Sequence, residues 1–444
     1  MNISFQKKAT SRAIRSKPRD RAFSDMLIAT IMLLLTAFVP AMSKLHQAGE
    51  VSDNSVYNQV VWGVIYVVAA FKVSSLANIG AVVRFSWTLI LFAVWMLLST
   101  LWSVAPDVTI RESIELAGTT LVGIYLVVLF PLEKLLTVIS LVIGAIAVSS
   151  AFLIVFAPAR GRMSYGAGAW SGIYEEKNLL GAAMALGIVS LMAFALHARG
   201  RSLIRVIATI LICVAILIGA NSITSVADGV VTLILMFTIV LLRSSKTTGF
   251  ARVGIVIVAV AALLFSAIYG FQLGSIFEDL GRSSDLTGRT TFWPALWTAI
   301  NDRPVVGYGY GAFFKSATAS NYLSDFLSVS GGWTPYHAHS SMLQVLLNGG
   351  YVGLGISVMS LVVGLRRGFA FAFQPGNATR VWPVCIIVYL IIGSYSETYL
   401  GGINSIEALL FIAAFLYPVR RYLLKSEEAH QAKSEVPIRT IRRP

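Results

Sequence analysis

Long apolar segments recur along almost the whole chain, and short polar connections separate them. A helix that crosses the hydrocarbon core of a bilayer needs roughly 20 mainly apolar residues. Strands of a membrane barrel alternate apolar and polar positions, whereas these segments are continuously apolar, so the pattern predicts helices. About twelve windows meet or approach the required length: 26–43, 57–71, 85–104, 114–130, 135–156, 179–196, 203–219, 229–242, 253–271, 344–365, 381–395 and 406–417.

Composition leads to the same class of protein. Hydrophobic residues make up 56% of the 444 residues and charged residues only 13%, which is far from the balance of a soluble domain. Backbone groups cannot go unpaired in lipid, so the segments must form a helical bundle. We therefore predict an all-α polytopic integral membrane protein with about 12 transmembrane helices and a large extracytoplasmic loop containing short helices.

The distribution of Lys and Arg predicts the orientation of this bundle. If the N-terminus is cytoplasmic, twelve spans return the C-terminus to the same side, and 26 of the 35 basic residues then face the cytoplasm. This asymmetry agrees with the positive-inside rule. The net charge of +14 is then explained by topology and by attraction to anionic lipid headgroups. We expect no nucleic acid partner.

This topology divides the chain into five parts. A basic cytoplasmic segment, 1–25, precedes transmembrane helices one to nine in 26–271. The large periplasmic loop spans 272–342, transmembrane helices ten to twelve occupy 343–422, and a basic cytoplasmic tail covers 423–444. Long structured loops in a compact bundle are usually functional, so we expect the site in the large loop.

Basic residues on the outer face gather in two loops, the large one and a shorter one at 157–178. Positive charge is rare on this side, so its retention indicates an anionic ligand such as a phosphate or diphosphate. Ordinary solvated loop charges are the alternative. Seven of the nine outer basic residues belong to this group: Arg160, Arg162, Lys177, Arg282, Arg289, Arg303 and Lys315.

The large loop contains three conspicuous motifs. "DLTGRTTFWPALW" (285–297) predicts a turn into a short amphipathic helix that lies at the membrane interface. "GYGYG" (307–311) permits tight turns. "PYHAHSSMLQVLLNGGYVGLG" (335–355) places two histidines just ahead of the tenth helix. The amphipathic helix is expected to present four residues on one face: Phe292, Trp293, Leu296 and Trp297.

Four motifs together resemble the O-antigen ligase superfamily, which includes Wzy-type polymerases and ExoQ-type exopolysaccharide production proteins. In chain order they are "GAWSGIYEEKNLLGAAMALG", "TGRTTFW", "RPVVGYGYGAF" and "HAHSSMLQVLLNGGYVGLG". The resemblance implies a metal-independent membrane glycosyltransferase without a cofactor, at the outer face of the bacterial cytoplasmic (inner) membrane. It implies undecaprenyl-diphosphate-linked glycans as donor and acceptor, contact with membrane lipid, and a flippase and chain-length regulator in the same pathway.

The resemblance also implies site residues. His339 matches the key histidine of the family, and Arg289, which follows Thr-Gly, matches its diphosphate-binding arginine. Elementary chemistry agrees, because a neutral imidazole can deprotonate an acceptor hydroxyl and a guanidinium can hold the developing phosphate charge. Further candidates for binding the diphosphate or the glycan are Arg303, Arg160, Arg162, Lys177, His337, Tyr308 and Tyr310.

The chain departs from its relatives at four positions. Ser340 stands where relatives usually have Asn, and Glu176 where they often have His. Ser171 and Ile223 stand where relatives commonly have a basic residue. Two outer cations are thereby missing, and Arg160, Arg162 and Lys177 are the candidates to replace them.

Three functions remain open at this point. The ExoQ-like stretch "GIYEEKNLLG" favours polymerisation of lipid-linked repeat units into exopolysaccharide. The first alternative is an O-antigen ligase that transfers the glycan to lipid A core. The second is a polysaccharide transporter or flippase, which would carry ionisable residues deep within its spans. The few candidates, Glu115, Asp228 and Glu407, lie near predicted helix ends.

The histidine pair allows two other interpretations. His339 can be an ordinary loop residue without a chemical role. A zinc site formed by His337 and His339 is disfavoured, because zinc usually takes four ligands and no Cys or third His lies nearby in the sequence.

Overall fold

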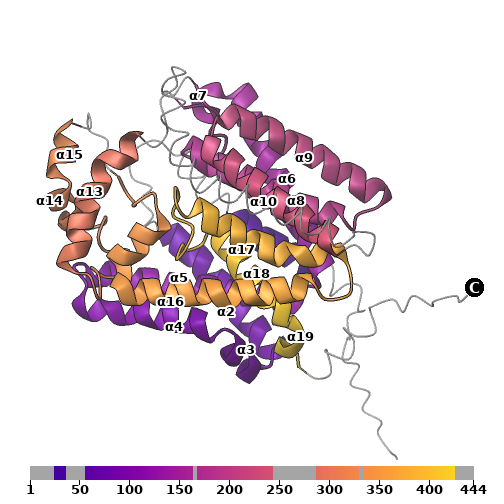
Figure 1. Cartoon of the computed structure of the whole chain (residues 1–444), viewed down its shortest axis with the longest axis horizontal. Coiled ribbons are helices and arrows are strands. Elements are labelled where there is room, and N and C mark those ends of the chain that lie inside the picture. The colour runs from indigo at the N-terminus through magenta and orange to yellow at the C-terminus, as the bar shows by residue number, and fades with distance from the viewer. Residues whose placement is uncertain (1–24, 37–55, 164–167, 244–286, 330–334, 426–444) are drawn as a thin grey trace, which may run out of the picture.

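The computed structural model describes residues 25–36, 56–163, 168–243, 287–329 and 335–425, which form helices joined by turns (Figure 1). A further short helix, Asp25–Thr36, precedes the labelled ones. The labelled helices are α2 (Val56–Leu76), α3 (Ile79–Phe85), α4 (Trp87–Leu98), η1 (Ser99–Trp102), α5 (Pro106–Leu129), α6 (Leu132–Phe156), α7 (Pro158–Gly161), α8 (Lys177–Ala195), α9 (Gly200–Ala220), α10 (Ile223–Leu242), α13 (Thr287–Asp302), α14 (Ala317–Tyr322), α15 (Ser324–Val329), α16 (Ser341–Ala372), η2 (Ala378–Val381), α17 (Trp382–Gly393), α18 (Ile406–Leu416), η3 (Tyr417–Val419) and α19 (Arg420–Leu423).

Seven of the described helices are long and apolar enough to cross a membrane: α2, α5, α6, α8, α9, α10 and α16. Shorter apolar helices cover Asp25–Thr36 and Ala378–Gly393. Each predicted window within the described ranges overlaps an apolar helix, and the window at 253–271 lies outside them. The predicted class, an all-α polytopic membrane protein, is confirmed.

The third predicted window, 85–104, does not form one straight span. It consists of two helices, Ile79–Phe85 and Trp87–Trp102, which are bent by 78°. The break is at Ser86, which ends α3 and begins α4. Its backbone N–H still bonds to the carbonyl of Val82, so the turn keeps its hydrogen bond while the chain changes direction. The sequence did not predict this bend, because the helices on both sides of it are apolar.

Helices α8 and α17 form the centre of the bundle. They contact each other, and α17 also packs against α10, α16 and α18. Trp382 and Tyr389 of α17 are fully buried and reach α8: the Trp382 indole donates to Ser190 Oγ (3.1 Å), and the Tyr389 hydroxyl donates to the carbonyl of Ala182 (3.1 Å). Because the indole N–H and the phenol O–H are hydrogen-bonded, these large side chains can fill an apolar core without leaving a polar group unpaired.

Helices α13, α14 and α15 lie together at one end of the bundle, beside the first turns of α16 (Figure 1). The predicted amphipathic helix is therefore present as α13, but its four large residues do not share one exposed face. Phe292 and Leu296 are fully buried in a core with Leu343 and Leu346 of α16. Burial of these two side chains depends on α16, whose apolar surface the local sequence does not reveal, and the position of α13 at the membrane interface stays a prediction.

Helix α16 is interrupted at Gly350, whose backbone adopts φ 64°. The "GYGYG" loop passes directly against this break, where Tyr308 N donates to Leu347 O (2.7 Å) and Tyr351 N donates to Pro304 O (2.8 Å). A Cβ on Gly350 would lie 2.2 Å from the carbonyl of Val305. Glycine is therefore required here by both the backbone conformation and the close approach.

Candidate functional site

His339 lies in the turn immediately before α16, and its side chain is almost completely buried. The residue is only 4% exposed, and its backbone has φ 47°. A left-handed backbone is unusual for a residue other than glycine and is frequent at functional sites. Its Nδ1 lies 3.7 Å from Oε2 of Glu397, which is also 4% exposed. The structure thus pairs the predicted histidine with a buried carboxyl from the α17–α18 connection.

Several contacts stabilise residues 337–340, the histidine turn, in this conformation. Ala338 N donates to Gln344 Oε1 (2.9 Å), and Ala338 O accepts from Trp293 Nε1 (2.9 Å). His339 N donates to His337 Nδ1 (3.0 Å). An unfavourable backbone conformation persists only where the surroundings over-determine it, and α13, α16 and His337 all contribute here.

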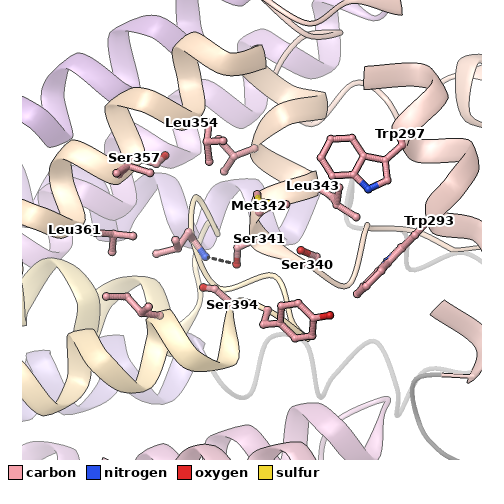
Figure 2. Close-up of a pocket in the computed structure, with 15 residues that line it drawn as sticks. Trp293, Trp297, Ser340, Ser341, Met342, Leu343, Leu354, Ser357, Leu361 and Ser394 are labelled. Carbon is pink, nitrogen blue, oxygen red and sulfur yellow. Dashed lines mark hydrogen bonds between the residues drawn. The ribbon is translucent and has the colours of Figure 1, made fainter. Parts of the chain in front are cut away.

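Ser341, the first residue of α16, connects the histidine turn to the segment that contains Glu397 through hydrogen bonds. Its hydroxyl donates to Glu397 O (3.0 Å) and accepts from Tyr399 N (2.8 Å) and Leu400 N (3.1 Å); the bond from Leu400 is the dashed line in Figure 2. The Ser341 amide also donates to Ser394 O (2.9 Å). One small polar residue therefore sets the distance between His339 and Glu397.

An apolar cavity of about 530 Å³ is lined by Ser340 and Ser341, the two residues that follow His339 (Figure 2). Trp293 and Trp297 of α13 line one side, and Leu343 and Leu361 of α16 line another. At its edge Val358 of α16 and Tyr395 are 48% and 42% exposed, so the cavity opens on the outside of the helical bundle. Its shape and chemistry suit an apolar chain.

A second loop reaches the histidines from the other side. The hydroxyl of Tyr336 donates to Glu176 Oε1 (3.1 Å), and the Tyr336 ring lies edge-on against His337 at 4.4 Å between centroids. Glu176 directly precedes α8. The predicted "GIYEEKNLLG" motif and the histidine motif, which are 160 residues apart at this contact, therefore form one surface.

Part of the chain is similar to a known protein family. Residues 207–358 match the O-antigen ligase family. This confirms the resemblance inferred from the motifs. The matched stretch includes α13, Arg289, the "GYGYG" loop, His339 and the first part of α16, whereas Glu176 and Glu397 lie outside it.

Two relatives extend the comparison. The exopolysaccharide production protein ExoQ of Rhizobium meliloti is 26% identical over 341 residues, which cover 74% of this chain and 74% of ExoQ. The ComP-specific O-oligosaccharyltransferase of Acinetobacter baylyi is 32% identical over 152 residues, which cover 33% of this chain and 27% of that protein. Together with the O-antigen ligase match, these similarities indicate a multi-pass membrane enzyme that transfers glycosyl groups.

The predicted cations lie in different elements of the chain. Arg289 lies in the first turn of α13, and its side chain is outside the described part. Lys177 is the first residue of α8, next to Glu176. Arg160 and Arg162 are exposed in the loop around α7. Arg303 lies against the Tyr308 ring at 5.0 Å and donates to Trp102 O (3.3 Å).

The two predicted sugar-stacking tyrosines are buried. Tyr308 and Tyr310 are each 2% exposed. The Tyr308 hydroxyl donates to Ala299 O (2.8 Å) and the Tyr310 hydroxyl to Gly401 O (2.5 Å). Both rings pack inside the protein and offer no open face to a glycan, so their place in the site is structural. The exposed aromatic ring next to the histidines is Tyr336, which is 50% exposed.

Sequence reasoning missed Glu397 and Ser341. A signal for Glu397 exists, because "SYSETY" interrupts two apolar windows with a single carboxylate. The contact with His339 depends on how α17 and α18 return to the start of α16, which the sequence does not show. As for metal ligands, the described ranges bring together no group of three or more His, Cys, Asp or Glu side chains.

Proposed function

We propose that this protein polymerises undecaprenyl-diphosphate-linked oligosaccharide repeat units into exopolysaccharide at the outer face of the bacterial cytoplasmic membrane. The observation that carries the proposal is the buried His339–Glu397 pair together with an apolar cavity. The pair supplies a base at the start of α16, and the cavity, lined by the following Ser340 and Ser341, supplies a place for a lipid chain.

In the proposed reaction His339 is the general base. Its Nε2 takes the proton from the acceptor hydroxyl, and the acceptor oxygen attacks the anomeric carbon of the donor glycan. The bond from that carbon to the diphosphate oxygen breaks, and undecaprenyl diphosphate leaves with the electron pair. Glu397, on the Nδ1 side, orients the ring and stabilises the imidazolium that forms. Base assistance of this kind contributes about 100- to 10,000-fold to a rate.

Arg289 is proposed to hold the diphosphate. A guanidinium forms paired hydrogen bonds with phosphate oxygens and keeps its charge throughout the reaction. Arg289 is placed in α13, the helix that also contributes Trp293 and Trp297 to the cavity. A diphosphate at the start of α13 and a polyprenyl chain in the cavity would then be two ends of one ligand. Lys177, Arg160 and Arg162 are proposed to support the diphosphate from the other loop.

Similarity to ExoQ over 74% of the chain supports polymerisation over the alternatives. In this proposal the N- and C-termini are cytoplasmic, a flippase delivers the repeat units, and a chain-length regulator acts on the same product. The O-antigen ligase match and the oligosaccharyltransferase relative favour a second candidate, transfer of the glycan to lipid A core or another acceptor.

Reconstitution in liposomes tests the proposal. Purified protein with one lipid-linked repeat unit should give a ladder of longer lipid-linked glycans without an ion gradient. Addition of lipid A core tests the second candidate, since a ligase would modify it and leave the repeat unit unpolymerised. Movement of unaltered lipid-linked glycan across the bilayer, without any new glycosidic bond, would instead support a flippase.

A further inference from the structure

The contact between Tyr336 and Glu176 has the features of a sugar-binding surface. Tyr336 is 50% exposed, whereas the neighbouring His339 is 4% exposed. Its ring centroid lies 6.2 Å from that of His339. The His337 ring contacts both, at 4.4 Å from the Tyr336 ring and 3.9 Å from the His339 ring, so a sugar that covers Tyr336 would lie on the surface next to the two histidines. Amphipathic aromatic rings with a polar neighbour are suited to such contacts.

Carboxylates dominate the electrostatics around this ring. Partial burial of the hydroxyl, and then the negative charges of Glu176, Glu175 and Glu397, raise the pKa of Tyr336 above its ordinary value. The hydroxyl therefore stays protonated and donates to Glu176. Carboxylate oxygens accept hydrogen bonds from several donors at once, so Glu176 can also accept from sugar hydroxyls. The same charges oppose a second anion.

We propose that Tyr336 and Glu176 form the acceptor-sugar subsite of the transferase, and that it takes a terminal sugar without a negative charge. This inference rests on the proposed function. The bound sugar is the acceptor and not the donor, because its hydroxyl must reach His339, whereas the donor's diphosphate belongs beside Arg289 and away from the carboxylates. A uronic acid or phosphorylated sugar at the acceptor end is a poor substrate.

Lys177 directly follows Glu176 in the sequence. In this proposal the two residues separate an acceptor-sugar region from a phosphate-binding region. The carboxylate side at Tyr336 binds hydroxyl groups, and the cationic side binds phosphate. The departure from the family at Glu176, where relatives often carry His, then gives this chain a different acceptor preference.

Two matched acceptors test the inference. One is a short-chain polyprenyl-diphosphate disaccharide that ends in glucose, and the other ends in glucuronic acid, which differs by a carboxylate at C6. Binding to the full-length protein in nanodiscs and elongation are both measured. We expect the wild type to bind the glucose-terminated acceptor about tenfold more tightly, which corresponds to about 1.4 kcal/mol, since the carboxylate of glucuronic acid would be repelled or left unpaired.

Variants identify the residues responsible. Glu176→Gln should reduce the tenfold preference to about two- to threefold, and Tyr336→Ala should raise KM for the glucose acceptor about tenfold with little change in kcat. Tyr336→Phe keeps the ring and should have a smaller effect. Asp325→Asn, which removes an exposed carboxylate from α15, is the matched control and should leave the preference unchanged.

The two proposals fail in different ways. Equal binding of both acceptors, or a preference that Glu176→Gln leaves intact, overturns the subsite even if polymer is made. A preference that depends on Glu176, together with an absence of elongation, supports the subsite as a binding site and overturns the polymerase. The binding measurement does not depend on turnover, so a catalytically silent preparation still decides the question.

Discussion

The imidazole of His339 and the carboxyl of Glu397 face each other at 3.7 Å, and both side chains are only 5% exposed. They come from segments 58 residues apart in sequence, and Ser341 bonds to both the backbone of Glu397 and that of Tyr399. A 3.7 Å separation is longer than a hydrogen bond. Such contacts often tighten when substrate binds, so Glu397 is close enough to orient the His339 ring in the proposed reaction.

His339→Ala should abolish polymer formation. Loss of a general base costs about 100- to 10,000-fold, which in a complementation assay is close to a complete loss. His337→Ala should have a weaker effect, because only His339 matches the position of the family's key histidine. Immunoblots of membranes control for insertion. Normal polymer from His339→Ala with failure of His337→Ala would assign the base to the other histidine.

Glu397 should be needed for its charge and not only for its volume. Glu397→Gln keeps the size of the side chain but cannot stabilise an imidazolium, so we expect at least about a tenfold lower rate of elongation. Glu397→Asp is shorter yet keeps the carboxylate, and it should retain more activity than Glu397→Gln. A purely structural role would give the reverse order, which makes the pair of variants decisive.

Arg289→Lys should impair elongation strongly, although lysine keeps the positive charge. A lysine is a point charge and cannot reproduce the forked contact of a guanidinium with a diphosphate. Arg303→Lys is the comparison, because Arg303 is engaged with Tyr308 and Trp102 and should affect stability more than binding. The measurement is polymer yield at equal expression. A normal yield from Arg289→Lys removes this residue from the site.

Gly350→Ala should destabilise the protein. The left-handed backbone alone costs about 1–3 kcal/mol for a residue with a side chain, and the new Cβ would lie 2.2 Å from the Val305 carbonyl. Gly355→Ala, in the same helix, is the control, since nothing lies within 4 Å of its Cβ position; it should be neutral or stabilising by up to about 1 kcal/mol. Thermal unfolding in detergent should show a lower Tm for Gly350→Ala alone.

The predicted topology places both termini in the cytoplasm and residues 272–342 outside. Ser316, in the described part of that loop, caps α14 through its side chain, so a reporter inserted after it occupies a surface turn between helices. A reporter that functions only outside the cytoplasmic membrane should be active there. Activity of a strictly cytoplasmic reporter at this position would contradict the orientation inferred from the distribution of Lys and Arg.

The sequence alone determined the helical class and the approximate places of the helices, and it singled out His339, whose role stays a prediction. These features are local. An apolar stretch in lipid must satisfy its own backbone groups and therefore becomes a helix, and motif order along the chain is enough to relate residues 207–358 to O-antigen ligases. The bend at Ser86 escaped prediction because the residues on both sides of it are apolar, so hydropathy alone does not distinguish one helix from two.

The tertiary structure decided which residues surround the histidine. Glu397 reaches His339 only because α17 and α18 return to the start of α16, and Glu176 reaches Tyr336 only because α8 begins beside the same turn. The structure also shows that Tyr308 and Tyr310, which the sequence suggested as glycan-binding residues, are buried in the core, where their hydroxyls donate to backbone carbonyls. Side-chain pairing across the bundle depends on how helices pack, and packing is a property of several distant segments together, which no single stretch of sequence encodes.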